Sequence, residues 1–247
     1  VELCGISKSN SSVDYAMLEY CIREDLKLKA SRAMAVLDPI KLVIDNYPEG
    51  QTEELEVDNN MENPELGKRV VPFGREVYIE REDFMEEPPK KYRRLYPGNE
   101  VRLMNAYFVT CTGFEKDEDG KVTVVHCTYD PESRGGNSPD GRKVRGTIHW
   151  VSAADAVKAQ VRLYENIIDE EKGVYNEDGS LNLNPNSLTV LDNCYVEPSL
   201  LKAKKYDSFQ FVRNGFFCVD AKDSTPEHPV FNRIVSLKSS YKLPTQA

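Results

Sequence analysis

The spacing of hydrophobic residues changes once along the chain, near residue 32. Between residues 11 and 28 the apolar side chains recur at the three- and four-residue spacing of an amphipathic helix. Ser11 and Asp14 stand where a capping box would begin that helix, with Asp in place of the more common Glu. Beyond residue 32 the apolar residues gather into short runs that predict strands at 41–44, 76–79, 101–103, 106–110, 122–129, 146–151, 161–164, 209–212, 216–219 and 232–235.

The segments between these runs favour an antiparallel arrangement. Asp-Gly pairs lie between such runs at 119–120, 140–141 and 178–179, and this dipeptide is a strong hairpin signal. Many short strands without intervening helices are typical of antiparallel sandwiches and barrels. We therefore expect a mainly β protein. Its predicted irregular segments are a helical turn or connector at 152–160, a loop at 48–68, and surface excursions at 130–145 and 169–187.

The composition is that of a globular protein and limits its cellular setting. The chain has 247 residues and a formal net charge of −9, and no apolar run approaches the roughly 18 residues of a membrane span. The first residues lack a basic segment followed by an apolar one, so no signal peptide is expected. The missing initiator Met suggests that a further N-terminal part precedes them. Six cysteines, none closer than 16 positions to the next, are expected to be reduced thiols in a cytoplasmic protein.

The familiar catalytic and cofactor motifs are absent from the sequence. His126, His149 and His228 do not have the spacing of a zinc site, so no metal is expected. There is no P-loop, no G-x-G-x-x-G loop and no G-x-S-x-G nucleophile motif. The run GRKVRG at 141–146 is basic, but a strand follows it, so we interpret it as a solvated turn. No catalytic residue is predicted, although a hydrolase with a Cys–His pair formed by folding stays open as an alternative.

One basic cluster stands out against the acidic background. Within residues 90–102 it gathers five cations around two tyrosines: Lys90, Lys91, Arg93, Arg94 and Arg102, with Tyr92 and Tyr96. Guanidinium groups hydrogen-bond phosphates and base edges, and aromatic rings stack on unpaired bases. Composition alone leaves two interpretations open, an RNA-binding surface and an ordinary solvated face.

Longer strings, in order and spread over nearly the whole chain, carry a family resemblance. They are LEYCIREDL (18–26), RAMAVLDP (32–39), VPFGREVYIEREDF (71–84), YRRLYPGNEVRLMNAY (92–107), GTIHWVSA (146–153), VRLYE (161–165), FQFVRNGFFCVD (209–220) and PVFNRIVSLK (229–238). The chain resembles the anticodon-binding half of the glutaminyl-tRNA synthetases, bacterial members more than animal ones. This resemblance implies a proximal and a distal antiparallel β-barrel after a short helical connector. It places the connector at 1–31, the first barrel region at 32–147, and the second at 148–247, with C-terminal strands that return to the first.

The resemblance also implies that the catalytic part of the enzyme lies outside this chain. An N-terminal Rossmann domain with the family's ATP motifs would precede it, and ATP and Mg²⁺ would act only in the full-length enzyme that joins glutamine to its tRNA. The chain itself would need no cofactor and would not aminoacylate. It would bind the anticodon loop of tRNA-Gln, as a cytoplasmic monomer without a membrane partner.

The resemblance assigns three residues to the pocket for the middle anticodon base. Arg32 and Gln210 match residues of that pocket, and Arg213 matches a nearby arginine. An amide pairs with a uracil edge, while guanidinium donors take its carbonyl oxygens or a phosphate. Because residues 32 and 210 would share one pocket, we expect the first and last strands to be neighbours.

The other two anticodon bases are assigned to the basic cluster. Arg94 matches the residue that reads the third base, and Arg93 lies at an adjacent position that is usually lysine. Arg102 matches an arginine near the first base. Lys91 belongs to the same surface but stands where the bacterial pattern has glutamine, and Met104 replaces an arginine. Either departure would change tolerance at the first base or phosphate contacts, and we expect Met104 to be a packing residue.

Two further interpretations remain open at this stage. A glutamyl-tRNA synthetase of archaeal or eukaryotic type shares the β architecture and would prefer a different third base. A free-standing β-barrel adaptor that binds RNA or protein would have no catalytic domain at all.

Overall fold

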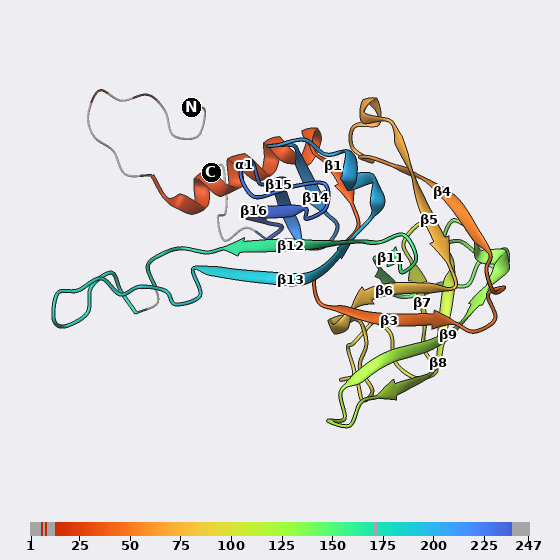
Figure 1. Ribbon diagram of the computed structural model, residues 1–247. Helices are drawn as coiled ribbons and strands as arrows, with labels where there is room; N and C mark the ends of the chain where they lie inside the picture. The colour runs from red at the N-terminus through yellow and green to blue at the C-terminus, as the bar shows by residue number, and fades with distance from the viewer. Residues whose placement is uncertain (1–5, 7, 9–12, 170–171, 239–247) are drawn as a thin grey trace, which may run out of the picture.

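A single helix precedes two β-barrels in the computed structural model, which describes residues 6, 8, 13–169 and 172–238 (Figure 1). The helix α1 (Tyr15–Lys29) begins at Asp14, whose carboxylate accepts a hydrogen bond from the Ala16 N–H at 2.8 Å. The predicted capping box is therefore wrong in one respect, because Asp14 is itself the N-cap. Ser11 lies outside the described residues.

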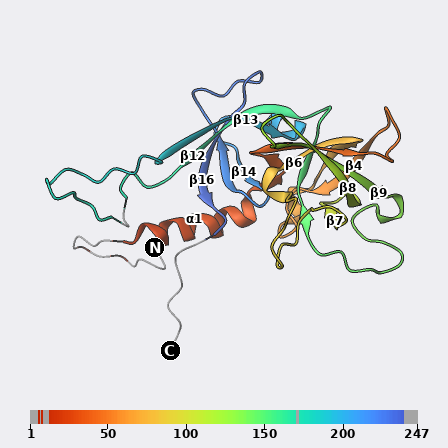
Figure 2. The ribbon, with the colours of Figure 1, turned by 90° about the horizontal axis from the view of Figure 1, so that it is seen from below.

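One face of α1 packs against the second barrel (Figure 2). Ile22 and Leu26 contact a small buried cluster that includes Phe216. Arg23 is buried at the same contact and donates from Nε to the Ser236 carbonyl oxygen at 2.7 Å. The helix is thus fixed to the barrel by both apolar burial and a long-range hydrogen bond.

The first barrel is a seven-stranded sheet from the middle of the chain. In hydrogen-bonding order its strands are β10 (Thr147–Ile148), β7 (Glu100–Leu103), β8 (Phe108–Lys116), β9 (Val122–Asp130), β3 (Pro39–Ile44), β6 (Glu76–Glu80) and β11 (Trp150–Ser152). β8 and β9 form the hairpin predicted at Asp119-Gly120. Aromatic side chains fill the centre, where Phe73 meets Trp150 edge to face with ring centres 5.0 Å apart.

The second barrel combines the end of the chain with two short strands from its beginning. In order its strands are β1 (Ser31–Ala33), β14 (Ser208–Phe211), β15 (Gly215–Val219), β16 (Val230–Ser236), β12 (Val157–Tyr164), β13 (Leu188–Val196) and β2 (Ala35–Val36). The connection between β12 and β13 extends away from the barrel (Figure 1). The surface excursion predicted at 169–187 lies in this connection.

Both sheets close by the same device. β1 and β2 lie at opposite edges of the second sheet, although only Met34 separates them in the chain. β10 and β11 likewise lie at opposite edges of the first sheet and are separated only by His149. A strand that bends at one buried residue thus supplies both edges, so each sheet curves into a nearly closed barrel. The single strand predicted at 146–151 is therefore two strands.

The strands on either side of each bend belong to the barrel formed mainly by the other predicted region. β1 and β2 precede β3 in the sequence but belong to the second barrel. β11 follows residue 147 but belongs to the first barrel. The regions 32–147 and 148–247 therefore each carry a small part of the other barrel. The backbone crosses between the barrels just after each bend, between β2 and β3 and between β11 and β12.

A hairpin that the sequence did not predict lies beside the first barrel. β4 (Thr52–Asp58) and β5 (Lys68–Gly74) pair antiparallel over their full length. The loop prediction at 48–68 is wrong for β4, in which buried Leu55 and Val57 alternate with exposed acidic residues. Because the segment is rich in carboxylates, the alternation of buried and exposed residues that is typical of a half-buried strand was not recognised.

Two further predictions are corrected by the second barrel. A helical turn or connector was expected at 152–160. Only a short connecting turn is present, because β11 ends at Ser152 and β12 already begins at Val157. β13 was not predicted at all, since most of its first six residues are exposed. Four 3₁₀ turns complete the described chain: η1 (Pro64–Leu66), η2 (Arg81–Asp83), η3 (Pro131–Ser133) and η4 (Pro198–Lys202). The described cysteines are free thiols: Cys21, Cys111, Cys127, Cys194 and Cys218.

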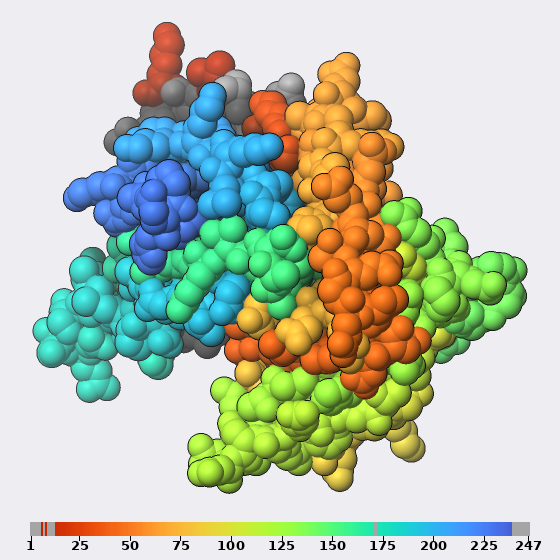
Figure 3. All heavy atoms as spheres, turned by 45° about the vertical axis from the view of Figure 1, so that its right-hand side comes forward, coloured from red at the N-terminus to blue at the C-terminus, as the bar shows by residue number. Residues whose placement is uncertain are grey.

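Buried carboxylates join the two barrels, which lie in direct contact (Figure 3). Glu197 accepts hydrogen bonds from Arg69 Nε at 2.5 Å and from the Met34 N–H at 2.9 Å. Glu80 accepts two backbone N–H groups at 2.9 Å each. Burial would raise the pKa of Glu80, but the hydrogen bonds from His149 and from these N–H groups lower it overall. Glu80 is therefore held in its charged form, and both carboxylates are fixed in place between the barrels by their hydrogen bonds.

Candidate nucleic-acid interface

The pairing of β1 with β14 brings together two residues that are 178 positions apart. Arg32 and Gln210 are direct partners in the parallel register of these strands. Arg32 Nε donates to Gln210 Oε1 at 3.2 Å. Residues 32 and 210 are therefore adjacent, as expected, but the neighbour of the first strand is β14 and not the last strand, β16.

A cavity of about 260 Å³ opens beside this pair. Its lining residues are Arg32, Met34, Asp58, Met61, Arg69, Met104, Asn105, Gln210 and Val212. Polar groups occupy one part of the wall and flexible methionine side chains another, a combination that suits a flat ring with polar edges. Met104 packs against the hydrophobic core of the first barrel, as predicted, and also lines this cavity.

Glu62 is a second partner of Arg32 that the sequence did not indicate. Its carboxylate lies 2.7 Å from Arg32 Nη2 and 3.0 Å from Lys27 Nζ of α1. The hydrogen bond from Lys27 and the positive charge of both neighbours lower the pKa of Glu62. Glu62 therefore carries a negative charge at neutral pH and orients the Arg32 side chain in the free protein.

Arg94 and Arg213, which the resemblance assigns to different bases, meet at one carboxylate. Asp83 is fully buried and accepts hydrogen bonds from Arg213 Nη1 and Nη2 at 2.6 Å each. Arg94 Nε lies 3.2 Å from the same carboxylate, and its Nη1 donates to Glu82 at 2.7 Å. Arg213 is not a lining residue of the cavity beside Gln210, although it follows Gln210 by three positions.

A second cavity, of about 470 Å³, lies at Arg102 on β7. The guanidinium carbon of Arg102 lies 5.2 Å from the centre of the Phe108 ring, and its buried Nε has no hydrogen-bond partner in the described part of the chain. Arg142 stacks on the same ring at 5.1 Å but is ion-paired with three carboxylates. Arg102 is therefore oriented by stacking, with donors left for a ligand.

Lys143 and Arg145 line the Arg102 cavity and were missed by the sequence interpretation. Both are exposed, and neither forms an ion pair with any described residue. The basic run 141–146 was a signal that could have found them. The run alone did not show that it folds over Arg102, because a charged turn is more often simply solvated.

The cluster at 90–94 lies against this same loop. Gly146 has a φ of +105°, and a Cβ at this position would lie 1.9 Å from the Arg93 carbonyl oxygen. Lys91 and Arg93 are exposed and have no ion-pair partner within the described chain. The two basic segments therefore form one surface, although more than 40 residues separate them in the sequence.

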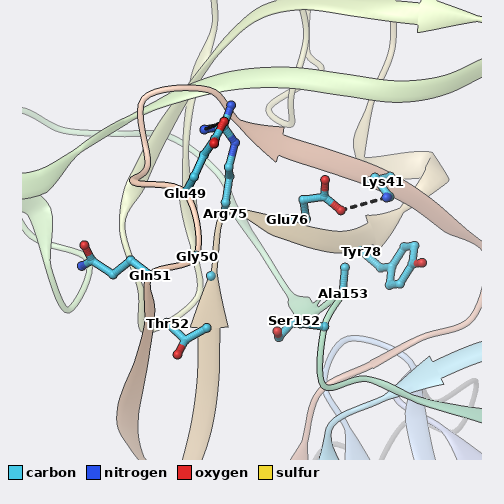
Figure 4. A pocket seen from close by; sticks show the side chains of 12 residues that line it. Lys41, Glu49, Gly50, Gln51, Thr52, Arg75, Glu76, Tyr78, Ser152 and Ala153 are labelled. Carbon is cyan, nitrogen blue, oxygen red and sulfur yellow. Dashed lines mark hydrogen bonds and ion pairs between the residues drawn. The ribbon is translucent and has the colours of Figure 1, made fainter.

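A third hollow, of about 460 Å³, differs in its electrostatics (Figure 4). Lys41 forms an ion pair with Glu76 at 2.8 Å, and Arg75 lies 3.5 Å from Glu49. Both cations are offset by a neighbouring carboxylate. This hollow therefore lacks the unpaired positive charge that attracts a phosphate backbone.

The described residues offer neither a metal site nor a membrane-spanning helix. No three His, Cys, Asp or Glu side chains among them come together in a way that could hold a metal ion. No helix among them has both the length and the apolar character needed to cross a membrane.

Two β-barrels that carry oriented arginines beside open cavities are characteristic of a nucleic-acid-binding module. Two family models, both described as "tRNA synthetases class I (E and Q), anti-codon binding domain", match residues 30–130 and 147–220. The chain belongs to this family of anticodon-binding domains.

Three relatives of the chain share one enzyme name, glutamine–tRNA ligase. The chain is 54% identical over 242 residues to the glutamine–tRNA ligase of Clostridium kluyveri, and 55% over 243 residues to that of Clostridium perfringens. The glutamine–tRNA ligase of Bradyrhizobium diazoefficiens is 52% identical over 241 residues. These alignments cover 97% to 98% of this chain but only 43% of each relative, so the chain spans less than half of their length. The predicted family and the predicted fold of two barrels after a helix are confirmed.

Proposed function

We propose that this chain recognises the anticodon loop of tRNA-Gln as the anticodon-binding part of a glutamine–tRNA ligase. The whole enzyme would join glutamine to tRNA-Gln with ATP and Mg²⁺, in a Rossmann catalytic domain whose ATP motifs do not occur in these 247 residues. The chain alone would then bind tRNA without aminoacylating it. In the cell it would act in the cytoplasm as part of a monomeric enzyme. The names of the curated relatives support this proposal.

The observation that carries the proposal is the Arg32–Gln210 pair at the wall of a cavity. The Gln210 amide offers one acceptor and two donors, which suits the mixed edge of a uracil, and Arg32 adds donors for a carbonyl oxygen. The neighbouring methionines would contact the faces of the ring. A wrong base would leave a buried donor or acceptor unpaired, at a cost of about 1–3 kcal/mol.

The other two anticodon bases would lie over the basic surface. Arg94, with Arg93 beside it, would read the third base, and Arg102 on its Phe108 platform would meet the first base. Phosphate contacts from Lys91, Lys143 and Arg145 would add salt-sensitive affinity without sequence information. An anticodon loop suits this arrangement, because its bases can unstack and enter separate sites.

A comparison of two RNA stem–loops tests the proposal. One carries the anticodon loop of tRNA-Gln, and the other has its third anticodon base replaced by that of tRNA-Glu. We expect the glutamine loop to bind at least about 10-fold more tightly, which corresponds to about 1.4 kcal/mol. Equal binding of both loops would contradict the choice of tRNA-Gln. A chain that binds neither loop at low salt would contradict anticodon recognition itself.

A further inference from the structure

Asp83 lies where the two barrels meet and contacts residues of both. It is the last residue of η2 in the first barrel, whereas Arg213 lies in the turn between β14 and β15 of the second. The Asp83 side chain is 0% exposed and is held at 2.6 Å by both terminal nitrogens of Arg213. Arg94 approaches the same carboxylate from the segment before β7, with its Nε at 3.2 Å.

Two guanidinium groups therefore share a single buried carboxylate. Glu82 supplies a second negative charge, 2.7 Å from Arg94 Nη1 and 3.7 Å from Arg213 Nη2, but its side chain is 70% exposed. A buried ion pair is strong only while its geometry and hydrogen bonds are complete. Movement of one guanidinium away from Asp83 therefore changes the hold on the other.

Arg213 connects this ion-pair cluster to the cavity for the middle base. Arg213 follows Gln210 by three positions and has a φ of +67°, a left-handed conformation that a non-glycine residue adopts only when its surroundings hold it there. Asn214 beside it donates to the buried Glu80 at 3.2 Å. The hydrogen bonds between Asp83 and Arg213 therefore help to fix the end of β14. They also help to fix the position of Gln210 on that strand.

We propose that Asp83 is a positioning residue that couples the reading of the middle and the third anticodon bases, an inference that rests on the function proposed above. A correct third base holds Arg94 in place, and this keeps Asp83 oriented toward Arg213 and the end of β14. A wrong base at either position loosens the shared carboxylate. A second wrong base then binds to a site that is already partly disordered. The loss of affinity caused by both wrong bases is therefore smaller than the product of the losses that each causes alone.

Four stem–loops measure this coupling in the unmodified chain. They carry the native anticodon, a changed middle base, a changed third base, or both changes. The coupling is the affinity loss of the double change divided by the product of the two single losses. We expect the doubly changed loop to bind at least about 5-fold more tightly than that product gives. Agreement with the product within about 2-fold would overturn the proposal.

Variants then assign the coupling to the carboxylate. Asp83→Asn keeps the shape of the side chain but removes its charge, and it should reduce the coupling to within about 2-fold of additivity. Arg213→Lys, which cannot form the two-pronged contact, should do the same and serves if Asp83→Asn does not fold. Asp220→Asn is the matched control and should keep the full coupling. The side-chain partners of Asp220 are Arg162, at 3.6 Å, and Asn232, both in the second barrel, and neither is assigned to an anticodon base.

The outcomes separate this inference from the proposed function. Full coupling in a folded Asp83→Asn or Arg213→Lys chain would leave Asp83 a purely structural role and would overturn the inference. Single base changes that leave the affinity unaltered would instead overturn the proposed function. Single changes that weaken binding, with penalties that simply multiply, would overturn the Asp83 coupling alone.

Discussion

At the scale of single residues, Arg32 shows how a side chain is prepared for a ligand. Gln210 holds its Nε and Glu62 holds its Nη2, while Glu62 is itself paired with Lys27. These contacts restrict the rotamers of Arg32 in the free protein, so the proposed binding of an anticodon base would cost less conformational entropy. The side chain is still 22% exposed, so it could also donate to a ligand, as the proposed function requires.

Gln210→Ala should reduce discrimination at the middle base more than it reduces general affinity for RNA. Without the amide, the native loop loses its matched hydrogen bonds, and its advantage over a loop with a changed middle base should fall by about 1–3 kcal/mol. Fluorescence anisotropy with both loops measures this difference. Gln160→Ala is the control, because Gln160 lies on β12 of the same barrel and contacts Asp192 instead. Equal losses of affinity for both loops would refute the assignment of Gln210.

His126 should make the free energy of unfolding depend on pH. Its ring nitrogens lie 3.0 Å from Asp45 and 3.0 Å from Glu115, and these hydrogen bonds raise the pKa of His126 above its ordinary 6.5. Because the folded pKa is the higher one, the stabilisation is complete below about pH 6.5 and is lost as pH rises through the folded pKa. The carboxylates are exposed, so the effect should stay below about 1 kcal/mol.

Denaturant unfolding of the wild-type chain and of His126→Gln at about pH 6 and pH 8.5 measures this contribution. The two proteins should differ more in stability at the lower pH than at the higher. His228→Gln is the control, because the His228 ring has no hydrogen-bond partner among the residues described. A His126→Gln deficit that does not shrink with rising pH would contradict the argument.

At the scale of elements, a strand can be predicted when its own side chains alternate between apolar and polar. The strands with which it pairs cannot be predicted in this way. The runs at 41–44 and 122–129 gave β3 and β9, but their parallel pairing follows from packing that no local pattern encodes. β4 was missed because acidic side chains mask its buried face, and the bend at His149 is set by contacts from distant residues. Local sequence thus gave most strands, while the closure of the barrels needed the structure.

The candidate site divides in the same way. The assignment of Arg32, Gln210 and Arg94 came from a family resemblance, and the structure gives the first two a shared cavity. Glu62 and Asp83 could not be predicted, because each is defined by a partner from a distant part of the chain. Neither carboxylate differs locally from the many other acidic residues of the sequence.

Gly146→Ala should destabilise the protein and disturb the basic surface together. A Cβ at Gly146 would meet the Arg93 carbonyl oxygen at 1.9 Å, in addition to the strain of its positive φ. We expect a loss of roughly 2–4 kcal/mol in the free energy of unfolding. Gly179→Ala is the matched control, since Gly179 also has a positive φ but a Cβ there meets nothing within 4 Å. Equal losses for the two variants would show that the close approach to Arg93 contributes nothing.

At the scale of the whole molecule, the distribution of charge matters more than its sum. The chain carries a formal net charge of −9, yet unpaired cations gather where the segments 90–94 and 141–146 meet. An RNA loop should therefore be attracted to this surface and repelled by most of the rest. The phosphate contacts should weaken as salt rises, while hydrogen bonds in the base cavities should be less affected.

The most direct test is the affinity of the chain for the native tRNA-Gln anticodon stem–loop and for the same loop with its middle base replaced, each at about 50 mM and 200 mM salt. We expect both affinities to fall at the higher salt while the preference for the native loop, at least about 10-fold, persists. Such a result would place base recognition in the cavity of Arg32 and Gln210. Equal binding of the two loops at both salt concentrations would contradict the central claim.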